Sequence, residues 1–89
     1  MSAESVTPLD KITEYSSFAS DIDLLADSPD AATPARWVLI IDAGSGTLDI
    51  DTTNETDVAL TGVLPGIELR LKFVKINLAT NIAKCWVGW

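Results

Sequence analysis

The sequence predicts an all-β protein, a small antiparallel β-sandwich or barrel with an extended or partly helical N-terminal arm. Residues 35–89 contain five or six short segments rich in β-branched and aromatic side chains. Short turns separate these segments, two of them with glycine or proline and the others rich in asparagine, aspartate and threonine. No long helical pattern lies between them, so parallel strands joined by crossover helices are not expected. With 89 residues, the chain has room for one domain.

The first predicted strands lie on either side of a glycine-rich turn. Residues 36–42 form a continuous apolar and β-branched run, and residues 43–46 supply the turn, because glycine reaches positive φ at little cost. Residues 47–52 then alternate, with Leu48 and Ile50 on one face and two aspartates on the other. The aspartate face is expected to be solvated.

The later strands follow the same period of two. Residues 58–64 form a strand closed by the turn pair Pro65-Gly66. Residues 67–75 show the clearest alternation, and residues 82–89 form the last strand. The predicted core comprises Val38, Ile40, Leu48, Ile50, Leu60, Leu69, Leu71, Phe73 and Val87.

Composition divides the chain into an acidic N-terminal arm, residues 1–34, and a β domain, residues 35–89. The arm holds seven acidic residues and one basic residue, with three prolines. Its apolar residues recur every three or four positions, which predicts a short amphipathic helix over about residues 8–19. This apolar stripe either docks on another subunit or packs back on its own domain.

The net charge of −7 excludes several classes of partner. The chain has 13 acidic and 6 basic residues, which argues against nucleic-acid binding and against anionic membrane surfaces. Its apolar runs are far too short to span a bilayer. The first residues lack a basic segment and a long apolar stretch, so we expect synthesis in the cytoplasm without an export signal.

The single cysteine, Cys85, has no histidine anywhere in the chain to activate it. It also has no partner for an internal disulfide. The simpler interpretation is a small core residue, and the alternative is a thiol-based activity. We expect no cofactor and no enzymatic activity.

Three motifs invite a functional interpretation. Residues 38–47 resemble the first phosphate loop of actin-like ATPases, but a turn between strands explains the same residues, and the chain is too short for such an enzyme. Residues 49–57 cluster oxygen ligands, yet Asn54 and Leu60 stand where a calcium loop needs glycine and glutamate. Glycoside hydrolysis by paired carboxylates would need a cleft that a small meander lacks.

The three tryptophans, Trp37, Trp86 and Trp89, allow two interpretations. Exposed aromatic rings on a β domain can stack on sugar rings, which would indicate a carbohydrate-binding module. Aromatic residues in alternating strands otherwise belong to the core or to an interface.

The order of motifs over residues 27–89 resembles the small spike-base proteins of tailed phages and gene transfer agents. The matching segments are Asp27-Ser28-Pro29, residues 33–38, residues 44–50, residues 62–76 and the tryptophan-containing end from Ala79. The resemblance implies a virion surface component with a small β domain, attached to the capsid or to a fibre. It implies no catalytic residues.

Together these observations predict a non-enzymatic virion structural protein, attached to the capsid as a decoration protein or as the base of a spike or head fibre. The alternative is a free-standing carbohydrate- or peptide-binding β module. The expected partners are capsid or other virion proteins and further copies of the chain in a three-fold or five-fold ring. Candidate contact residues are Leu9, Ile12, Tyr15, Phe18, Ile22, Arg70, Lys72, Lys75 and Trp89.

Overall fold

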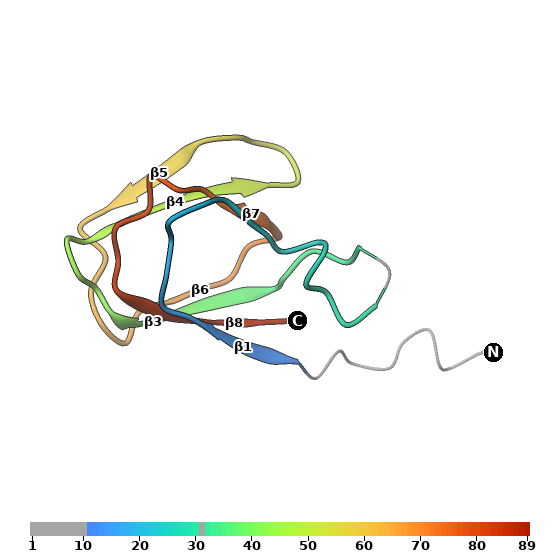
Figure 1. Ribbon diagram of the computed structural model, residues 1–89, viewed down its shortest axis with the longest axis horizontal. Coiled ribbons are helices and arrows are strands. Elements are labelled where there is room, and N and C mark those ends of the chain that lie inside the picture. The colour runs from blue at the N-terminus through green and yellow to red at the C-terminus, as the bar shows by residue number, and fades with distance from the viewer. Residues whose placement is uncertain (1–10, 31) are drawn as a thin grey trace.

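Two antiparallel four-stranded sheets pack face to face in the computed structural model, which describes residues 11–30 and 32–89 (Figure 1). The strands are β1 (Ile12–Tyr15), β2 (Ile22–Asp23), β3 (Trp37–Asp42), β4 (Thr47–Thr52), β5 (Val58–Thr61), β6 (Glu68–Leu69), β7 (Phe73–Ile76) and β8 (Lys84–Gly88). Sheet A has the order β1-β8-β3-β6, and sheet B has the order β2-β7-β4-β5. The predicted all-β sandwich is confirmed.

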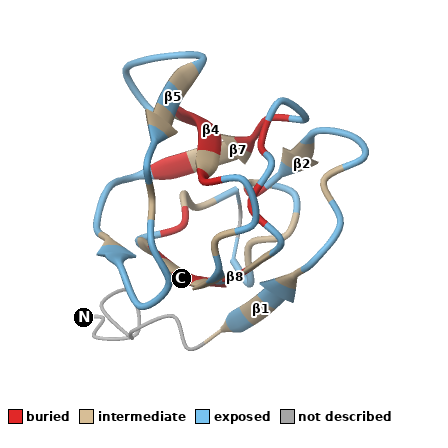
Figure 2. Ribbon diagram, turned by 90° about the vertical axis from the view of Figure 1, so that its left-hand side faces the viewer, coloured by how far each residue is buried: buried red, intermediate tan, exposed pale blue. Residues whose placement is uncertain are grey.

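The apolar core lies between the sheets and is built by residues of the inner strands and of the segments next to them. Its members are Leu24, Ala35, Val38, Ile40, Leu48, Ile50, Phe73, Ile76, Ile82, Cys85, Val87 and Trp89. Figure 2 shows the buried stretches on strands inside the sheets, such as β4 and β8, whereas the edge strands β1 and β5 are half-buried or exposed. Six of the nine predicted core residues are fully buried, which confirms the alternation in β3, β4 and β8.

The long strand predicted over residues 67–75 is wrong. The chain leaves sheet A after β6 and enters sheet B at β7, so residues 70–72 belong to neither ladder. Because this crossing interrupts the alternation, Leu71 is 46% exposed instead of buried. Leu60 and Leu69 were also predicted as core residues, but they are only half-buried and pack against the edge of the core.

The helix predicted over residues 8–19 is wrong wherever the structure describes it. Residues 12–15 form β1, which pairs with β8, and β2 pairs with β7 in the other sheet. Residues 8–10 lie outside the described part of the chain. Phe18 and Ile22 therefore pack back on their own domain, as does the fully buried Leu24, whereas Ile12 is 61% exposed. Tertiary pairing with two strands outweighs a weak helical periodicity.

The glycine-rich turn after β3 connects the two sheets. A Cβ at Gly44 would lie 2.6 Å from the backbone oxygen of Asn81, and its φ of +52° favours glycine. The turn thus packs tightly against the segment before β8 and has a structural use of its own. No helix in the described part of the chain is long and apolar enough to cross a membrane.

Candidate functional site

The most polar buried feature is a group of three carboxylates around one amide, which we call the Asp–Asn cluster: Asp49, Asp51, Asp57 and Asn77. The Asn77 amide nitrogen donates to the carboxylates of Asp49 and Asp51, at 2.9 Å each. The Asp57 carboxylate lies 3.4 Å from the same nitrogen. Both strand aspartates are only 9% exposed, so the expectation that their face of β4 is solvated is wrong.

Residues 77–81, which follow β7, cover that face of β4. The backbone N–H of Asn77 donates to the Asp49 carbonyl at 2.8 Å. The Thr80 hydroxyl donates to the same carbonyl at 3.0 Å and accepts from the Asp49 N–H at 2.8 Å. This loop therefore buries the polar face of β4 and supplies hydrogen-bond partners for it, as burial of polar groups requires.

These hydrogen bonds favour the charged form of Asp51. The amide of Asn77 and the backbone N–H of Asp57 lower the pKa of the Asp51 carboxyl below its ordinary value, against the opposing effect of burial. Lys75 adds a weaker attraction, with its Nζ 3.7 Å from Asp51 Oδ2. Within residues 11–30 and 32–89, no group of three or more histidine, cysteine or acidic side chains is arranged to hold a metal ion.

Two predicted contact residues, Tyr15 and Trp89, form hydrogen bonds with the segment of the same chain that follows β2. The Tyr15 hydroxyl donates to Asp27 Oδ2 at 2.6 Å, and Trp89 Nε1 donates to the Leu24 carbonyl at 3.3 Å. Lys11 Nζ lies 5.3 Å from the Trp89 ring centroid and donates to the Asp27 carbonyl. Trp89 is 2% exposed because its own core covers it, so little of its surface is open to a partner in the single chain.

The other apolar candidates of the N-terminal segment differ in how far they are exposed. Leu9 lies outside the described residues. Phe18 and Ile22 are half-buried against the core. Ile12, at 61% exposure, points away from the core on the outer face of sheet A. Among the described candidates of this segment, Ile12 is thus the apolar residue with most of its surface open to a partner.

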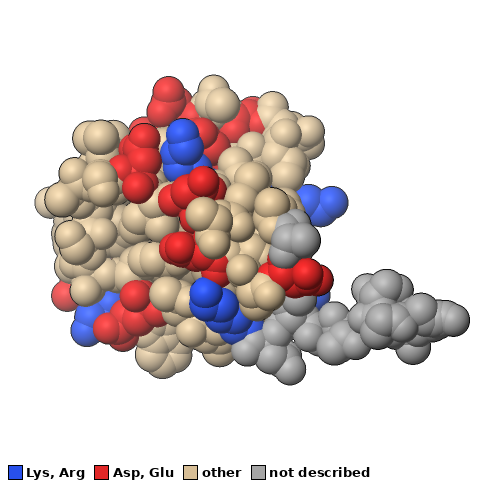
Figure 3. Space-filling view, turned by 45° about the vertical axis from the view of Figure 1, so that its right-hand side comes forward, with Lys and Arg blue, Asp and Glu red and all other residues tan. Residues whose placement is uncertain are grey.

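The basic candidates lie beside acidic residues of the same chain. Arg70 pairs with Glu68 at 2.8 Å on the surface, where such a pair contributes little. Lys75 lies beside Asp51 in the neighbouring strand. Acidic side chains are spread across the face shown in Figure 3, and most of the few basic side chains there lie next to them.

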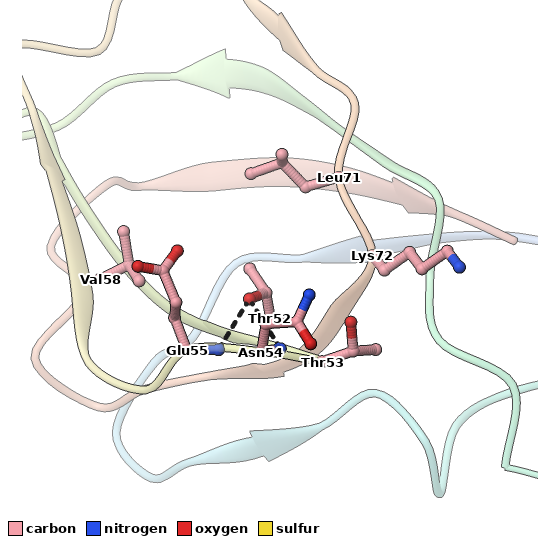
Figure 4. A pocket seen from close by; sticks show the side chains of 7 residues that line it. All are labelled: Thr52, Thr53, Asn54, Glu55, Val58, Leu71 and Lys72. Atoms are coloured by element: carbon pink, nitrogen blue, oxygen red, sulfur yellow. Dashed lines mark hydrogen bonds between the residues drawn. The ribbon is translucent and has the colours of Figure 1, made fainter.

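Lys72, the remaining basic candidate, borders a shallow depression of about 330 Å³ between the β4–β5 loop and the β6–β7 connection. The lining residues are Thr52, Thr53, Asn54, Glu55, Val58, Leu71 and Lys72 (Figure 4). The Thr52 hydroxyl already accepts the N–H groups of Asn54 and Glu55. In Figure 4, Lys72 and Glu55 extend in different directions, so the depression offers no adjacent acid and base.

The outer face of sheet A brings two tryptophans together. Trp37 pairs with Gly88, and Trp86 pairs with Leu39, so both rings stand on the solvent side of adjacent strands. The sequence alone does not indicate that Trp37 and Trp86 share a face, because this depends on the register between β3 and β8. The sequence does indicate that Trp86 points to solvent, because it alternates with the apolar residues Cys85 and Val87, which are buried.

Cys85 is protected by burial. Desolvation raises the pKa of its thiol to about 12, so the reactive thiolate is scarce at neutral pH. We expect a thiol reagent such as Ellman's reagent to label the native protein slowly at pH 7.5 and the urea-unfolded protein at once. Fast labelling of the native protein would contradict the core assignment.

The fold and the polar contacts define a small β-sandwich. Within it the Asp–Asn cluster and Tyr15 are hydrogen-bonded to other parts of the chain, and Cys85 is buried. Comparisons of this chain with protein-family models, with curated proteins and with solved structures found no match.

Proposed function

We propose that this chain is a non-enzymatic structural protein of a virus particle, made in the host cytoplasm and attached to the capsid as a decoration protein or as a spike or fibre base. The order of motifs over residues 27–89 supports this proposal, as does the small β-sandwich. In the Asp–Asn cluster, the carboxylates of Asp49 and Asp51 accept from the Asn77 amide, and Asp51 also accepts from the backbone N–H of Asp57. The partner is a capsid or other virion protein.

The observation that carries the proposal is an exposed apolar turn between β5 and β6. Leu64 is 62% exposed and Ile67 is 41% exposed, and the Ile67 N–H donates to the Leu64 carbonyl across Pro65-Gly66. The turn lies at the end of the sandwich away from the C-terminus (Figure 1). Two neighbouring aliphatic side chains held in solvent by a rigid turn form an apolar contact that a partner protein can cover.

The test is to purify particles from the source culture on a density gradient and to quantify this protein in them by mass spectrometry. We expect a constant ratio to the major capsid protein. The double variant Leu64→Lys, Ile67→Lys should remain folded and be lost from the particles. Leu78→Lys, which changes a 60% exposed leucine elsewhere, should remain bound. Recovery of the wild type only in the soluble fraction would refute the proposal.

The proposed particle component is expected to form a cyclic trimer or pentamer. A domain of 89 residues buries a modest share of its surface, and assembly adds stability. Light scattering should give three or five times the 9.5 kDa chain mass. A monomer at all micromolar concentrations would contradict this prediction. A truncation that removes residues 1–10 tests the arm, because β1 begins at Ile12 and removal of residues 1–26 would delete two strands.

A further inference from the structure

The outer face of sheet A carries a flat apolar surface, which we call the tryptophan platform: Ile12, Trp37, Leu39 and Trp86. Two rows of residues cross the sheet there. One row is Ile12, Gly88 and Trp37 on β1, β8 and β3. The other is Glu14, Trp86, Leu39 and Glu68 on β1, β8, β3 and β6. The second row therefore has an apolar centre and a carboxylate at each end.

Trp37 lies face down on the sheet. A Cβ at Gly88 would come within 2.0, 2.3 and 2.4 Å of three adjacent ring atoms, Cε2, Cζ2 and Nε1. Such nearly equal distances place that carbon over the ring face, not at the ring edge. Glycine at position 88 thus lets one face of the indole rest on the backbone, and the half-buried ring turns its other face outward.

Trp86 is held beside it with its polar atom satisfied. Its Nε1–H donates to Glu14 Oε1 at 3.0 Å, and the residue is 39% exposed. A tryptophan fixed by such a bond keeps its ring in one orientation, so ligand binding costs little side-chain entropy. Two ordered indoles on adjacent strands, with Leu39 between the acids of the same row, form a rigid aromatic surface.

We propose that the tryptophan platform binds a neutral oligosaccharide that lies across the strands. The apolar C–H face of a sugar ring stacks on an outward-facing indole, and its hydroxyl groups donate to carboxylates at the rim. Glu14 and Glu68 are separated by three strand spacings, about 14 Å, which is longer than one sugar ring. The ligand therefore spans several sugar units, with stacking at the centre and hydrogen bonds at both ends.

Charge determines which ligand fits. Acidic side chains end the Trp86 row on both sides: Glu14 accepts from the Trp86 indole, and Glu68 pairs with Arg70 on the surface. The whole chain carries a net charge of −7. An anionic glycan or a second copy of the chain would meet like charge at the platform. A peptide that binds by strand addition would use a sheet edge and not this face. A neutral glycan meets none of these penalties and uses the carboxylates as acceptors.

The test is an array of neutral and acidic oligosaccharides, followed by tryptophan fluorescence and ¹H–¹⁵N NMR titrations of the full chain. The probes are the hexaoses of cellulose, mannan and chitin, with heparin and polygalacturonate as acidic counterparts. We expect at least one neutral probe to bind below ~1 mM and to shift the indole N–H signals of Trp37 and Trp86, whereas the acidic probes do not bind.

Variants separate the platform from the rest of the surface. Trp86→Ala and Trp37→Ala should each weaken binding about ten-fold, and Trp86→Tyr should restore most of it because stacking survives. Gly88→Ala should act like Trp37→Ala, because the added carbon displaces the ring. Leu78→Ala should leave binding unchanged. NMR signal dispersion checks that each variant is folded.

Three results would overturn the proposal. The first is the absence of binding to every neutral probe, and the second is binding that both tryptophan-to-alanine variants retain. The third is a concentration-dependent dimer that Trp86→Ala dissociates, which would assign the platform to a second copy.

Discussion

Replacement of Asn77 by alanine should lower the free energy of unfolding by about 3 kcal/mol, a large part of the stability of a domain this small. The Asn77 amide is the shared donor of Asp49 and Asp51, which are 9% exposed. Its removal leaves two nearby carboxylates facing each other without that donor. Urea denaturation followed by tryptophan fluorescence measures the loss.

A matched control for this variant is Asn81→Ala. The Asn81 side chain accepts one hydrogen bond from the Thr47 N–H at 2.8 Å in an exposed position, so its loss should cost about 1 kcal/mol. Equal losses for the two asparagines would show that the Asp–Asn cluster contributes no more than an ordinary surface hydrogen bond.

The effect of Asn77→Ala should depend on pH. The folded protein lowers the pKa of Asp51, so this carboxylate contributes stability that is present above the pKa of an unfolded aspartate. That contribution is lost as pH falls through the lower folded pKa. Since Asn77 is the largest cause of the shift, the wild type and the variant should differ most at pH 7 and approach each other in acid, as pH falls below the pKa of an unfolded aspartate, ~4. A constant difference would contradict this account.

Replacement of Leu24 by alanine should destabilise the protein by about 3–4 kcal/mol. Leu24 is fully buried in the core, and its backbone groups bond to Val74 and to the Trp89 indole. The melting temperature should fall by more than ~10 °C in a chain of this length. Thermal unfolding monitored by circular dichroism gives the value.

Leu78→Ala is the control for Leu24→Ala, because Leu78 is 60% exposed and should change stability by less than ~0.5 kcal/mol. A truncation that removes residues 1–26 extends the same test. It deletes β1, β2 and Leu24 together, and we expect no cooperative unfolding transition. A stable, cooperative fold in that truncated chain would show that the N-terminal segment is dispensable.

Period-two alternation predicted the sheets where a strand has one buried face. It found Val38 and Ile40 in β3, and Leu48 and Ile50 in β4, because these side chains point into the space between the sheets. It misplaced the aspartates of β4, since a polar side chain on the outer face of a strand appears solvated until a loop from elsewhere covers it. The contact between Asp49 and Asn77 spans 28 residues, and no local pattern indicates it.

The N-terminal segment shows a second limit of local patterns. Its apolar residues fit a helical period, yet β1 and β2 each complete a different sheet. β1 has four residues and β2 has two, so neither strand is long enough for a period-two alternation to be recognised. Local patterns did not indicate the tryptophan platform for a related reason. Trp37 and Trp86 are 49 residues apart in the sequence, and only the register between β3 and β8 places them on the same face of the sheet.

The position of β8 inside sheet A affects the order of folding. This strand, residues 84–88, pairs with β1 on one side and β3 on the other. Sheet A therefore cannot assemble during synthesis until nearly all of the chain described here has left the ribosome, whereas the β4–β5 hairpin of sheet B can form early. β8 is distant in sequence from β1 and β3, so bringing these strands together costs chain entropy before the packing of the sheets offsets it. We therefore expect refolding to take milliseconds to seconds. During that interval the apolar strand β3 lacks its partner β8 and has an unpaired edge that another chain could join.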